Sequence, residues 1–214
     1  MPKPNHLTMT STLLGSLLAM ALTVSCIKQG SEPYSPKSGD LIFQTSRSLQ
    51  SRAVQKATGS PLSHMGIVYV ENGAPMVYEA VGPVQSTPLE TWINRGEGAH
   101  FSIKRLRDAR TLLTRDSLVK MREIGESFRG KPYDICFEWS DSSIYCSELV
   151  WKIYDQALGV QVGQLEKLAD FDLSSPEVRQ ILVERANCRL DPGEVVISPA
   201  AMFDSELLIL VHEE

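Results

Sequence analysis

The sequence predicts an α+β fold, in which strands and helices form separate blocks along the chain instead of alternating. Two β-rich runs, 65–71 and 75–81, are joined through Asn72-Gly73, a strong signal for a tight hairpin. Two later segments carry apolar residues at helical spacing, and they end at Gly130 and Gly159. Segregated strands and helices of this kind are typical of the α+β class.

The first elements follow from short local patterns. The apolar run at 40–44 predicts a strand, and the segment 49–58 has a helical pattern that Gly59-Ser60-Pro61 ends. The hairpin comes next, followed by a strand at 101–105.

Two longer helices and two late strands complete the expected order. The first of these helices has Leu118, Met121, Ile124 and Phe128 on one face and stops before Pro132. The second starts near Cys146 and keeps an apolar face as far as Gly159, formed by Leu149, Val150, Ile153, Tyr154 and Ala157. Late strands are expected at 195–197 and 207–211.

The N-terminus has the pattern of an export signal. An apolar run of 12 residues, Leu13 to Val24, is too short for a membrane span of about 20 residues but suits a signal-peptide core. The run ends at Ser25-Cys26 and resembles a bacterial lipobox, although its leucine stands one position early. We therefore expect a signal peptide at 1–25, a tether at 26–38 and one domain at 39–214. Cys26 is the candidate lipidation site, and a plain leader is the alternative, so the expected location is the periplasm or cell envelope.

Composition excludes some classes of function. The net charge is −5 and the sequence contains no basic patch of the kind that binds nucleic acid. It contains neither a CxxC pair nor a His-x₃₋₅-His pair, so no metal site is expected. Lipidation of Cys26 would leave three cysteines, an odd number that predicts at least one free thiol. Cys136 and Cys188 are candidates for a disulfide, but the sequence alone leaves the pairing open.

Cys146 and His64 are the candidate nucleophile and base. Cys146 opens a helix, where the N-terminal amides favour a thiolate, and His64 opens a strand. His100 and His212 are the rival bases. The alternative interpretation is a buried cysteine that acts only as a small apolar side chain.

Counting the hairpin register adds a carboxylate. If Asn72 and Gly73 are the two central turn residues, Gly66 lies opposite Glu79 and His64 opposite Val81. Side chains alternate between faces, so His64 and Glu79 share a face as diagonal neighbours about 7–8 Å apart at Cα. Gly66 leaves the space between them open, whereas a three-residue loop would turn Glu79 to the other face.

This arrangement predicts a Cys–His–carboxylate triad. Cys146 would attack, His64 would transfer the proton, and Glu79 would orient and stabilise the imidazolium. The backbone N–H of Cys146 would supply one oxyanion donor.

Several motifs in this order resemble those of the YiiX/YebB-like cysteine hydrolases, the circularly permuted branch of the NlpC/P60 (papain-like) superfamily. The matching segments are Gly39-Asp40-Leu41-Ile42-Phe43-Gln44, Ser63-His64-Met65-Gly66, the stretches 78–84 and 130–134, Tyr145-Cys146-Ser147-Glu148-Leu149-Val150, Phe171-Asp172-Leu173 and Ser198-Pro199. The resemblance implies a permuted papain-like fold, with an antiparallel sheet or partial barrel packed against the nucleophile helix. It carries the catalytic roles onto Cys146, His64 and Glu79.

The resemblance also implies substrate-binding positions at Tyr133, Asp134, Asp141 and Tyr145. The alternative interpretation of these four is a capping and turn cluster in front of the helix.

The expected function is that of an exported cysteine hydrolase acting on peptidoglycan peptides or small aminoacyl amides, without a metal or organic cofactor. Two alternatives remain. One is a lipid-directed acyltransferase or thioesterase of the lecithin:retinol acyltransferase-like type, and the other is a non-catalytic envelope-binding domain. A long apolar groove would favour acyl chains, whereas convergent Asp and Tyr groups would favour a peptide amine.

Overall fold

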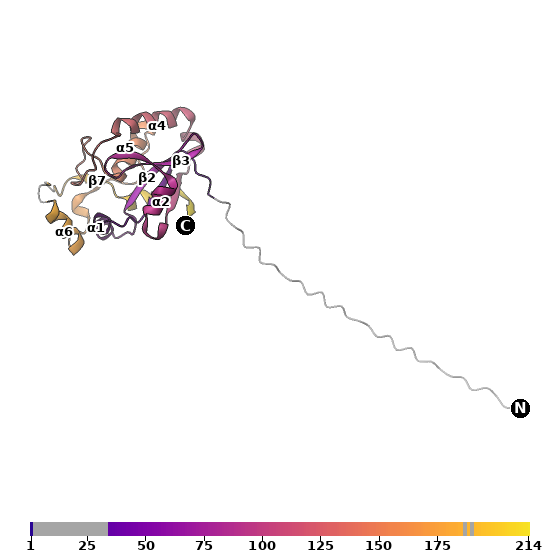
Figure 1. Ribbon diagram of the computed structural model, residues 1–214, viewed down its shortest axis with the longest axis horizontal. Helices are drawn as coiled ribbons and strands as arrows, with labels where there is room; N and C mark the ends of the chain where they lie inside the picture. Colours follow the sequence, from indigo (N-terminus) through magenta and orange to yellow (C-terminus); the bar gives the residue numbers. More distant parts are fainter. Residues whose placement is uncertain (2–33, 186–187, 189–190) are drawn as a thin grey trace. The chain divides into compact units, whose positions relative to one another are not determined.

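A computed structural model describes Met1 and residues 34–185, 188 and 191–214. The predicted signal peptide and Cys26 fall within residues 2–33, outside the described residues. The described domain contains a six-stranded sheet in which every neighbouring pair is antiparallel (Figure 1). The order across the sheet is β4-β3-β2-β1-β5-β8. These strands are β1 (Asp40–Gln44), β2 (His64–Glu71), β3 (Ala74–Ala80), β4 (Val84–Pro88), β5 (Ser102–Leu106) and β8 (Leu208–Glu213).

The β2–β3 hairpin has the predicted register. Glu71 pairs with Ala74 and Ile67 pairs with Tyr78. Asn72 and Gly73 both have positive φ, 50° and 83°, as a two-residue turn that follows the strand twist requires. The turn therefore fixes which face of the sheet each side chain of β3 occupies.

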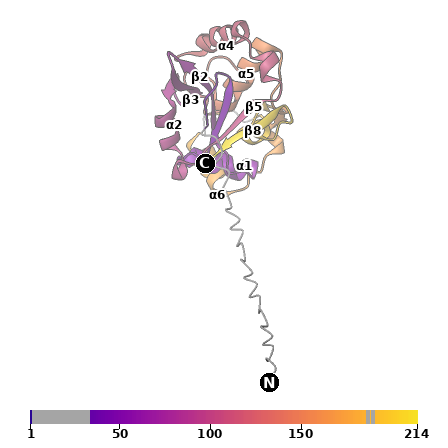
Figure 2. The ribbon, with the colours of Figure 1, turned by 90° about the vertical axis from the view of Figure 1, so that its right-hand side faces the viewer.

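Helices cover both faces of the sheet. On one face α5 (Cys146–Leu158) packs against β2 and β3, and α4 (Arg115–Phe128) packs against α5. The short α2 (Leu89–Arg95) lies over the opposite face, where Trp92 packs among apolar side chains of β1, β2, β3 and β5. Figure 2 shows α2 and α5 on opposite sides of the strands. The structure is thus an α+β fold, as predicted.

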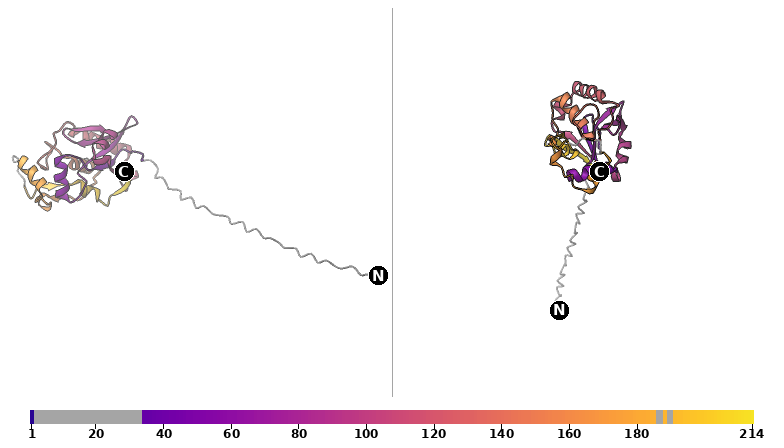
Figure 3. Two further views of the ribbon diagram at one scale, coloured as in Figure 1. Left: turned by 60° about the horizontal axis from the view of Figure 1, so that its bottom comes forward. Right: turned by 90° about the vertical axis from the view of Figure 1, so that its left-hand side faces the viewer.

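A helix pair forms a smaller apolar cluster beside the sheet. The predicted helix α1 (Leu49–Thr58) begins at Ser48, whose hydroxyl accepts the Ser51 N–H, and ends at Gly59 with a φ of 65°. It packs against α6 (Pro176–Glu184) through Ala53, Val178 and Ile181 (Figures 1 and 3). Both helices also form walls of a pocket that Cys146 lines.

Several elements of the structure were not predicted from the sequence. They are β4, α2 and α6 above, together with η1 (Glu97–Ala99), α3 (Ala109–Leu112), β6 (Glu166–Lys167), η2 (Leu168–Asp170) and α7 (Pro199–Phe203). β7 (Val195–Val196) falls within a predicted strand and pairs with β6 instead of joining the main sheet. None of the described helices has both the length and the apolar composition needed to cross a bilayer.

A buried ion pair explains the Gly39-Asp40 motif at the start of β1. The fully buried carboxylate of Asp40 accepts hydrogen bonds from Nε and Nη2 of Arg105, at 2.5 and 2.8 Å, and from the Tyr34 hydroxyl at 2.9 Å. A buried carboxylate needs such partners to offset its desolvation. Asp40 therefore ties β1 to β5 and has a structural place in the fold.

Candidate active site

Cys146 and His64 meet where α5 and β2 both begin. Each is the first residue of its element, and they are only 3% and 8% exposed. The backbone N–H groups of Met65 and Ser147 donate to the Cys146 sulfur. Cys146 is the free cysteine of the described residues. Two backbone amides and a helix N-terminus thus surround the sulfur with positive charge.

The neighbours of Cys146 anchor this end of α5. The Ser147 hydroxyl donates to the Ile197 carbonyl at 2.7 Å, and the Tyr145 hydroxyl accepts the Ile197 N–H at 3.1 Å. Glu148 caps the helix by accepting the Tyr145 N–H at 3.3 Å. Burial, opposed by the ion pair with Lys152, raises the pKa of Glu148 to about 7. The Tyr-Cys-Ser-Glu motif therefore holds the thiol in place through both of its flanks.

Glu79 lies against the opposite side of the His64 ring. Its Oε2 atom is 2.6 Å from His64 Nε2, which leaves Nδ1 as the ring nitrogen facing the thiol. Its Oε1 atom accepts hydrogen bonds from the Thr87 hydroxyl, at 2.6 Å, and from Arg95. The Trp92 ring stacks on His64 at 5.7 Å between centroids. The carboxylate is fully buried, so these three donors and the ring stack fix the imidazole orientation.

The pKa shifts of the pair favour the charged forms. Burial alone would lower the pKa of His64, but its hydrogen bonds to Cys146 and Glu79 raise it to about 9. Burial alone would raise the pKa of Cys146, but hydrogen bonds from His64 and two backbone amides lower it. Burial likewise opposes the ionisation of Glu79, and the contact with His64 lowers its pKa. A thiolate–imidazolium pair is the stable state between the two pKa values.

Gly66 makes the approach of His64 and Glu79 sterically feasible. A Cβ atom at this position would lie 2.5 Å from Val77 Cγ1 and 2.8 Å from the Tyr78 carbonyl oxygen, both on β3. We expect Gly66→Ala to displace β3, to destabilise the fold by about 1–3 kcal/mol and to weaken the His64–Glu79 contact. Thermal unfolding and the pH dependence of Cys146 alkylation would measure the two effects. The matched control is Gly193→Ala, an exposed turn position where the nearest atom to a new Cβ is 3.4 Å away.

A chain of side chains places the Tyr133 hydroxyl beside the sulfur. Arg185 donates to Gln50 Oε1 at 2.7 Å, and Gln50 Nε2 donates to the Tyr133 hydroxyl at 2.8 Å. Because that oxygen accepts from Gln50, its own hydrogen is free to point at Cys146, to which it hydrogen-bonds. Burial, followed by the neighbouring Cys146 charge, raises the pKa of Tyr133 far above its usual range, so the phenol stays protonated.

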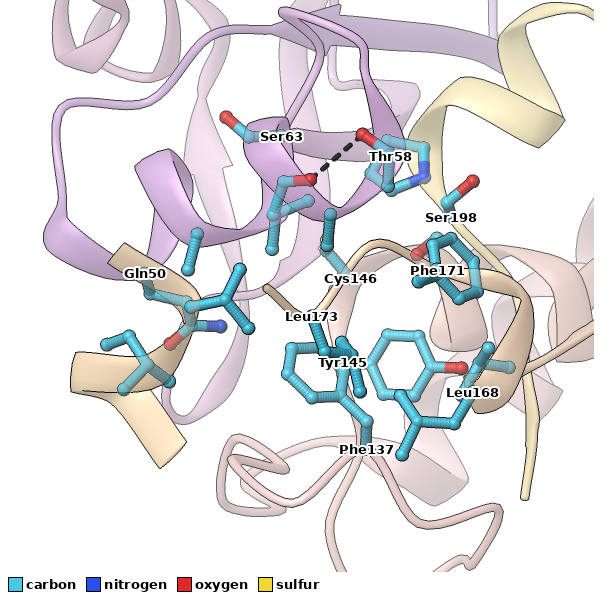
Figure 4. A pocket seen from close by; sticks show the side chains of 18 of the residues that line it. Gln50, Thr58, Ser63, Phe137, Tyr145, Cys146, Leu168, Phe171, Leu173 and Ser198 are labelled. Carbon is cyan, nitrogen blue, oxygen red and sulfur yellow. Dashed lines mark hydrogen bonds between the residues drawn. The ribbon is translucent and has the colours of Figure 1, made fainter. Parts of the chain in front are cut away.

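Two pockets adjoin the pair. The first, about 110 Å³, contains Cys146 in its lining and is walled mostly by apolar side chains of α1, α6 and the segments before and after α5 (Figure 4). The second, about 270 Å³, contains His64 in its lining together with Arg95 and several serine and glutamine side chains. Gln50, Ser63 and Tyr133 belong to both linings, so the two pockets meet at the pair.

The four predicted substrate-binding residues divide into two groups. Tyr133 and Tyr145 line the apolar pocket. Asp134 instead accepts the N–H groups of Cys136 and Phe137, at 2.7 and 3.1 Å, as a turn cap does. The Asp141 side chain is 66% exposed and pairs with Lys152. Neither aspartate is in the lining of either pocket.

The two rival bases lie in other parts of the fold. The rival base His212 lies on β8 at the sheet edge, where its ring stacks on Tyr34 and packs at a tilt against Phe101. His100 follows η1 and is exposed.

Sequence reasoning missed the residues that orient the pair, because each reaches the site from an element with no local motif. They are Gln50, Thr87, Trp92, Arg95 and Arg185.

Cys136 and Cys188 form a disulfide with a sequence separation of 52 residues. It connects the segment that carries Tyr133 and Phe137 to the region just after α6. Both connected segments contribute to the apolar pocket. The pairing that the sequence left open is thus settled in the described residues.

The family model of permuted papain-like amidases, the YaeF/YiiX or C92 family, matches residues 35–212. The chain belongs to this family. It is 45% identical over 181 residues to the uncharacterised protein YiiX of Escherichia coli K12, covering 85% of this chain and 88% of that protein. A crystal structure of YiiX from Escherichia coli O157:H7 superposes with a TM-score of 0.79 at 45% identity. It covers 85% of this chain and 99% of the other. Membership confirms the permuted papain-like fold and the cysteine-hydrolase class.

The solved YiiX is described as a metalloprotein. The residues described here contain no group of three or more His, Cys, Asp or Glu side chains that could hold an ion. At the site itself, the thiol has one imidazole neighbour, and the other ring nitrogen is bound to Glu79. These side chains therefore do not fit a metal ion.

Proposed function

We propose that this protein is an exported bacterial cysteine amidase that works through a Cys146–His64–Glu79 triad and an acyl-enzyme. The observation that carries the proposal is the buried contact of thiol, imidazole and carboxylate, with the pKa of the thiol lowered and that of the imidazole raised. Such opposed shifts in one cleft are typical of catalytic pairs.

The geometry supports a two-step reaction. The Cys146 thiolate attacks the carbonyl carbon of an amide, and the imidazolium of His64 gives its proton to the departing nitrogen. Neutral His64 then takes a proton from a water molecule, whose oxygen attacks the thioester, and departure of the sulfur restores the thiolate–imidazolium pair. Throughout, Glu79 holds Nε2 and stabilises the charged ring.

Two groups are placed to stabilise the oxyanion. One is the backbone N–H of Cys146 at the start of α5, where helix amides lack intrahelical acceptors. The other is the Tyr133 hydroxyl, whose hydrogen Gln50 leaves available. We therefore assign Tyr133 to the reacting centre as well as to the pocket wall.

Export is supported by the chemistry of the other cysteines. The N-terminal apolar run has the length of a signal peptide, and the Cys136–Cys188 disulfide suits an oxidising compartment. We propose a location in the periplasm or cell envelope, with Cys26 as the point of membrane attachment if it is lipidated.

Peptidoglycan peptides and small aminoacyl amides are the substrates suggested by the sequence resemblance. The mostly apolar lining of the pocket beside Cys146 favours a second candidate, a hydrolase or transferase directed at acyl chains. Both candidates use the same thiolate and differ in the group that the pocket receives.

Alkylation by iodoacetamide tests the triad and separates it from a non-catalytic binding domain. Because the pKa of Cys146 is lowered from 9.0, we expect it to react near pH 6 at a rate well above that of an ordinary thiol. His64→Ala should remove this low-pH reactivity, and intact mass should show one modification that Cys146→Ala lacks. A Cys146 that reacts only above pH 8 would contradict the proposal.

A further inference from the structure

Arg185 is held by a closed ring of bonds at the end of α6. Its backbone carbonyl accepts the Cys188 N–H at 2.8 Å, and its Nη1 atom donates to the Ile135 carbonyl at 2.6 Å. Ile135 directly precedes Cys136, and the Cys136–Cys188 disulfide closes the ring. The backbone and the guanidinium of Arg185 are therefore both tied to the segment that leads into α5.

The second guanidinium nitrogen decides which way the Gln50 amide faces. A guanidinium has only donors, so Nη2 of Arg185 must meet the amide through Oε1, at 2.7 Å. The NH₂ end of the amide is thereby turned to the Tyr133 hydroxyl, at 2.8 Å. The hydroxyl oxygen accepts this bond, and its single hydrogen is left for the sulfur of Cys146. Without the guanidinium, the amide is free to turn over, and Oε1 then takes that hydrogen.

The backbone around Tyr133 is held independently of Arg185. The Ile144 N–H donates to the Pro132 carbonyl at 3.1 Å, and the Asp134 N–H donates to the Ile144 carbonyl at 3.2 Å. The residues on both sides of Tyr133 are thus paired with the segment just before α5. Removal of the guanidinium should leave the phenol ring in place and change the direction of its hydrogen.

We infer that Arg185 is a positioning residue for the Tyr133 hydroxyl. Through the Gln50 amide it directs the hydrogen of the phenol to the oxyanion that forms when Cys146 attacks a carbonyl. This inference rests on the proposed function, in which Tyr133 is one of two oxyanion donors. No atom moves along the chain of hydrogen bonds. Its order of donors and acceptors is set before the reaction, as a preorganised oxyanion site requires.

Gln50→Glu separates the direction of the hydrogen bond from mechanical support. A carboxylate keeps the shape of the side chain and still accepts from Arg185, so the variant should be at least as stable as the wild type. It has no hydrogen to donate, so the Tyr133 hydroxyl must donate to it and turn away from the reacting carbonyl. We expect acylation of Cys146 by p-nitrophenyl acetate to slow about 100-fold, the loss typical of one oxyanion donor.

Alkylation by iodoacetamide provides the internal reference. It consumes the same thiolate, but the reaction displaces iodide and forms no oxyanion. The ratio of the acylation rate to the alkylation rate therefore cancels changes in the amount or nucleophilicity of the thiolate. In Arg185→Met this ratio should fall about tenfold, because the amide then takes either orientation. Arg185→Lys should recover part of the ratio, since an ammonium still donates to Oε1 of Gln50.

A Tyr133→Phe background identifies the route of the effect. Without the hydroxyl, neither Gln50→Glu nor Arg185→Met should lower the ratio further. Two controls repeat the chemical changes at exposed positions outside both pocket linings. They are Arg179→Met on α6 and Gln156→Glu on α5, and both should keep the wild-type ratio.

The outcomes separate this inference from the proposed function. A wild-type ratio in Gln50→Glu, or the same loss with and without the Tyr133 hydroxyl, would overturn the inference while Cys146 remained the acylated nucleophile. A wild-type thiol that iodoacetamide alkylates but the ester does not acylate above the Cys146→Ala blank would overturn the proposed function, and the inference with it. If Arg185→Met does not fold, Gln50→Glu decides alone, because it keeps the contact with the guanidinium.

Discussion

Cys146→Ala is expected to lower the turnover of amide substrates by at least about 10⁴-fold, because the acyl-enzyme of the proposed mechanism forms on this thiol. The other cysteines of the described residues are joined in the Cys136–Cys188 disulfide. The activity that remains should be only the direct attack of water on a substrate carbonyl that the oxyanion donors still bind. Steady-state kinetics with an N-acyl amino acid, together with intact-mass detection of the acyl-enzyme, would measure the loss.

Folding must be separated from chemistry in this experiment. Cys146 is 3% exposed and small, so the alanine variant should unfold within a few degrees of the wild type. Cys146→Ser is the matched control for shape. Its hydroxyl does not ionise near neutral pH, so it should be almost as inactive as the alanine variant. Substantial turnover by either properly folded variant would mean that another residue is the nucleophile.

The sequence alone predicted the position of a site residue where one local feature determined the backbone geometry. Asn72-Gly73 dictated the hairpin register, and the register placed Glu79 on the same face as His64. The apolar period of α5 likewise put Cys146 at a helix N-terminus. In both cases the prediction depended only on residues within one hairpin or one helix, so the packing of other segments could not change the result.

The surroundings of the pair depend on contacts between distant segments. Gln50 and Tyr133 are 83 positions apart, and Gln50 and Arg185 are 135 apart, so no periodicity connects them. The apolar pocket has the same origin, since its walls meet only when α1 packs on α6. Its volume and polarity were therefore beyond what the sequence shows.

Asp134 and Asp141 show a different limit. Both stand in the segment before Cys146, where a carboxylate serves equally well as a substrate ligand or as a cap. In the structure Asp134 binds backbone N–H groups and Asp141 binds Lys152 at the surface. Only the direction of the side chain separates these uses, and a pattern of residue types does not contain it.

Glu79→Gln should lower kcat by about 10²- to 10⁴-fold while keeping the shape of the side chain. The carboxylate accepts from three donors, His64, Thr87 and Arg95. A glutamine amide must turn its NH₂ group toward at least one of them, so it leaves a buried donor facing a donor. The imidazolium loses its counter-charge at the same time.

The pH profile distinguishes loss of this charge from general damage. The pKa of His64 is raised from 6.5 to about 9, partly by Glu79, so wild-type kcat/KM should fall on the alkaline side near pH 9 as the acid is lost. In Glu79→Gln this limb should move toward lower pH.

The same ionisation affects stability. A raised folded-state pKa stabilises the fold below pH 6.5, and that stability is lost as pH rises through about 9. The deficit of Glu79→Gln in thermal unfolding should therefore be smaller above pH 9 than at pH 6.

Glu71→Gln is the matched control, since Glu71 lies on the same hairpin and pairs with Arg122 at the surface. It should change neither kcat nor the alkaline limb, because a partly exposed pair contributes little and is remote from the imidazole. If Glu79→Gln kept the wild-type limb near pH 9, the carboxylate would have no part in setting the charge of His64. The contacts of Glu79 with Thr87 and Arg95 would then be structural, and His64 would act with Cys146 as a catalytic pair without a third member.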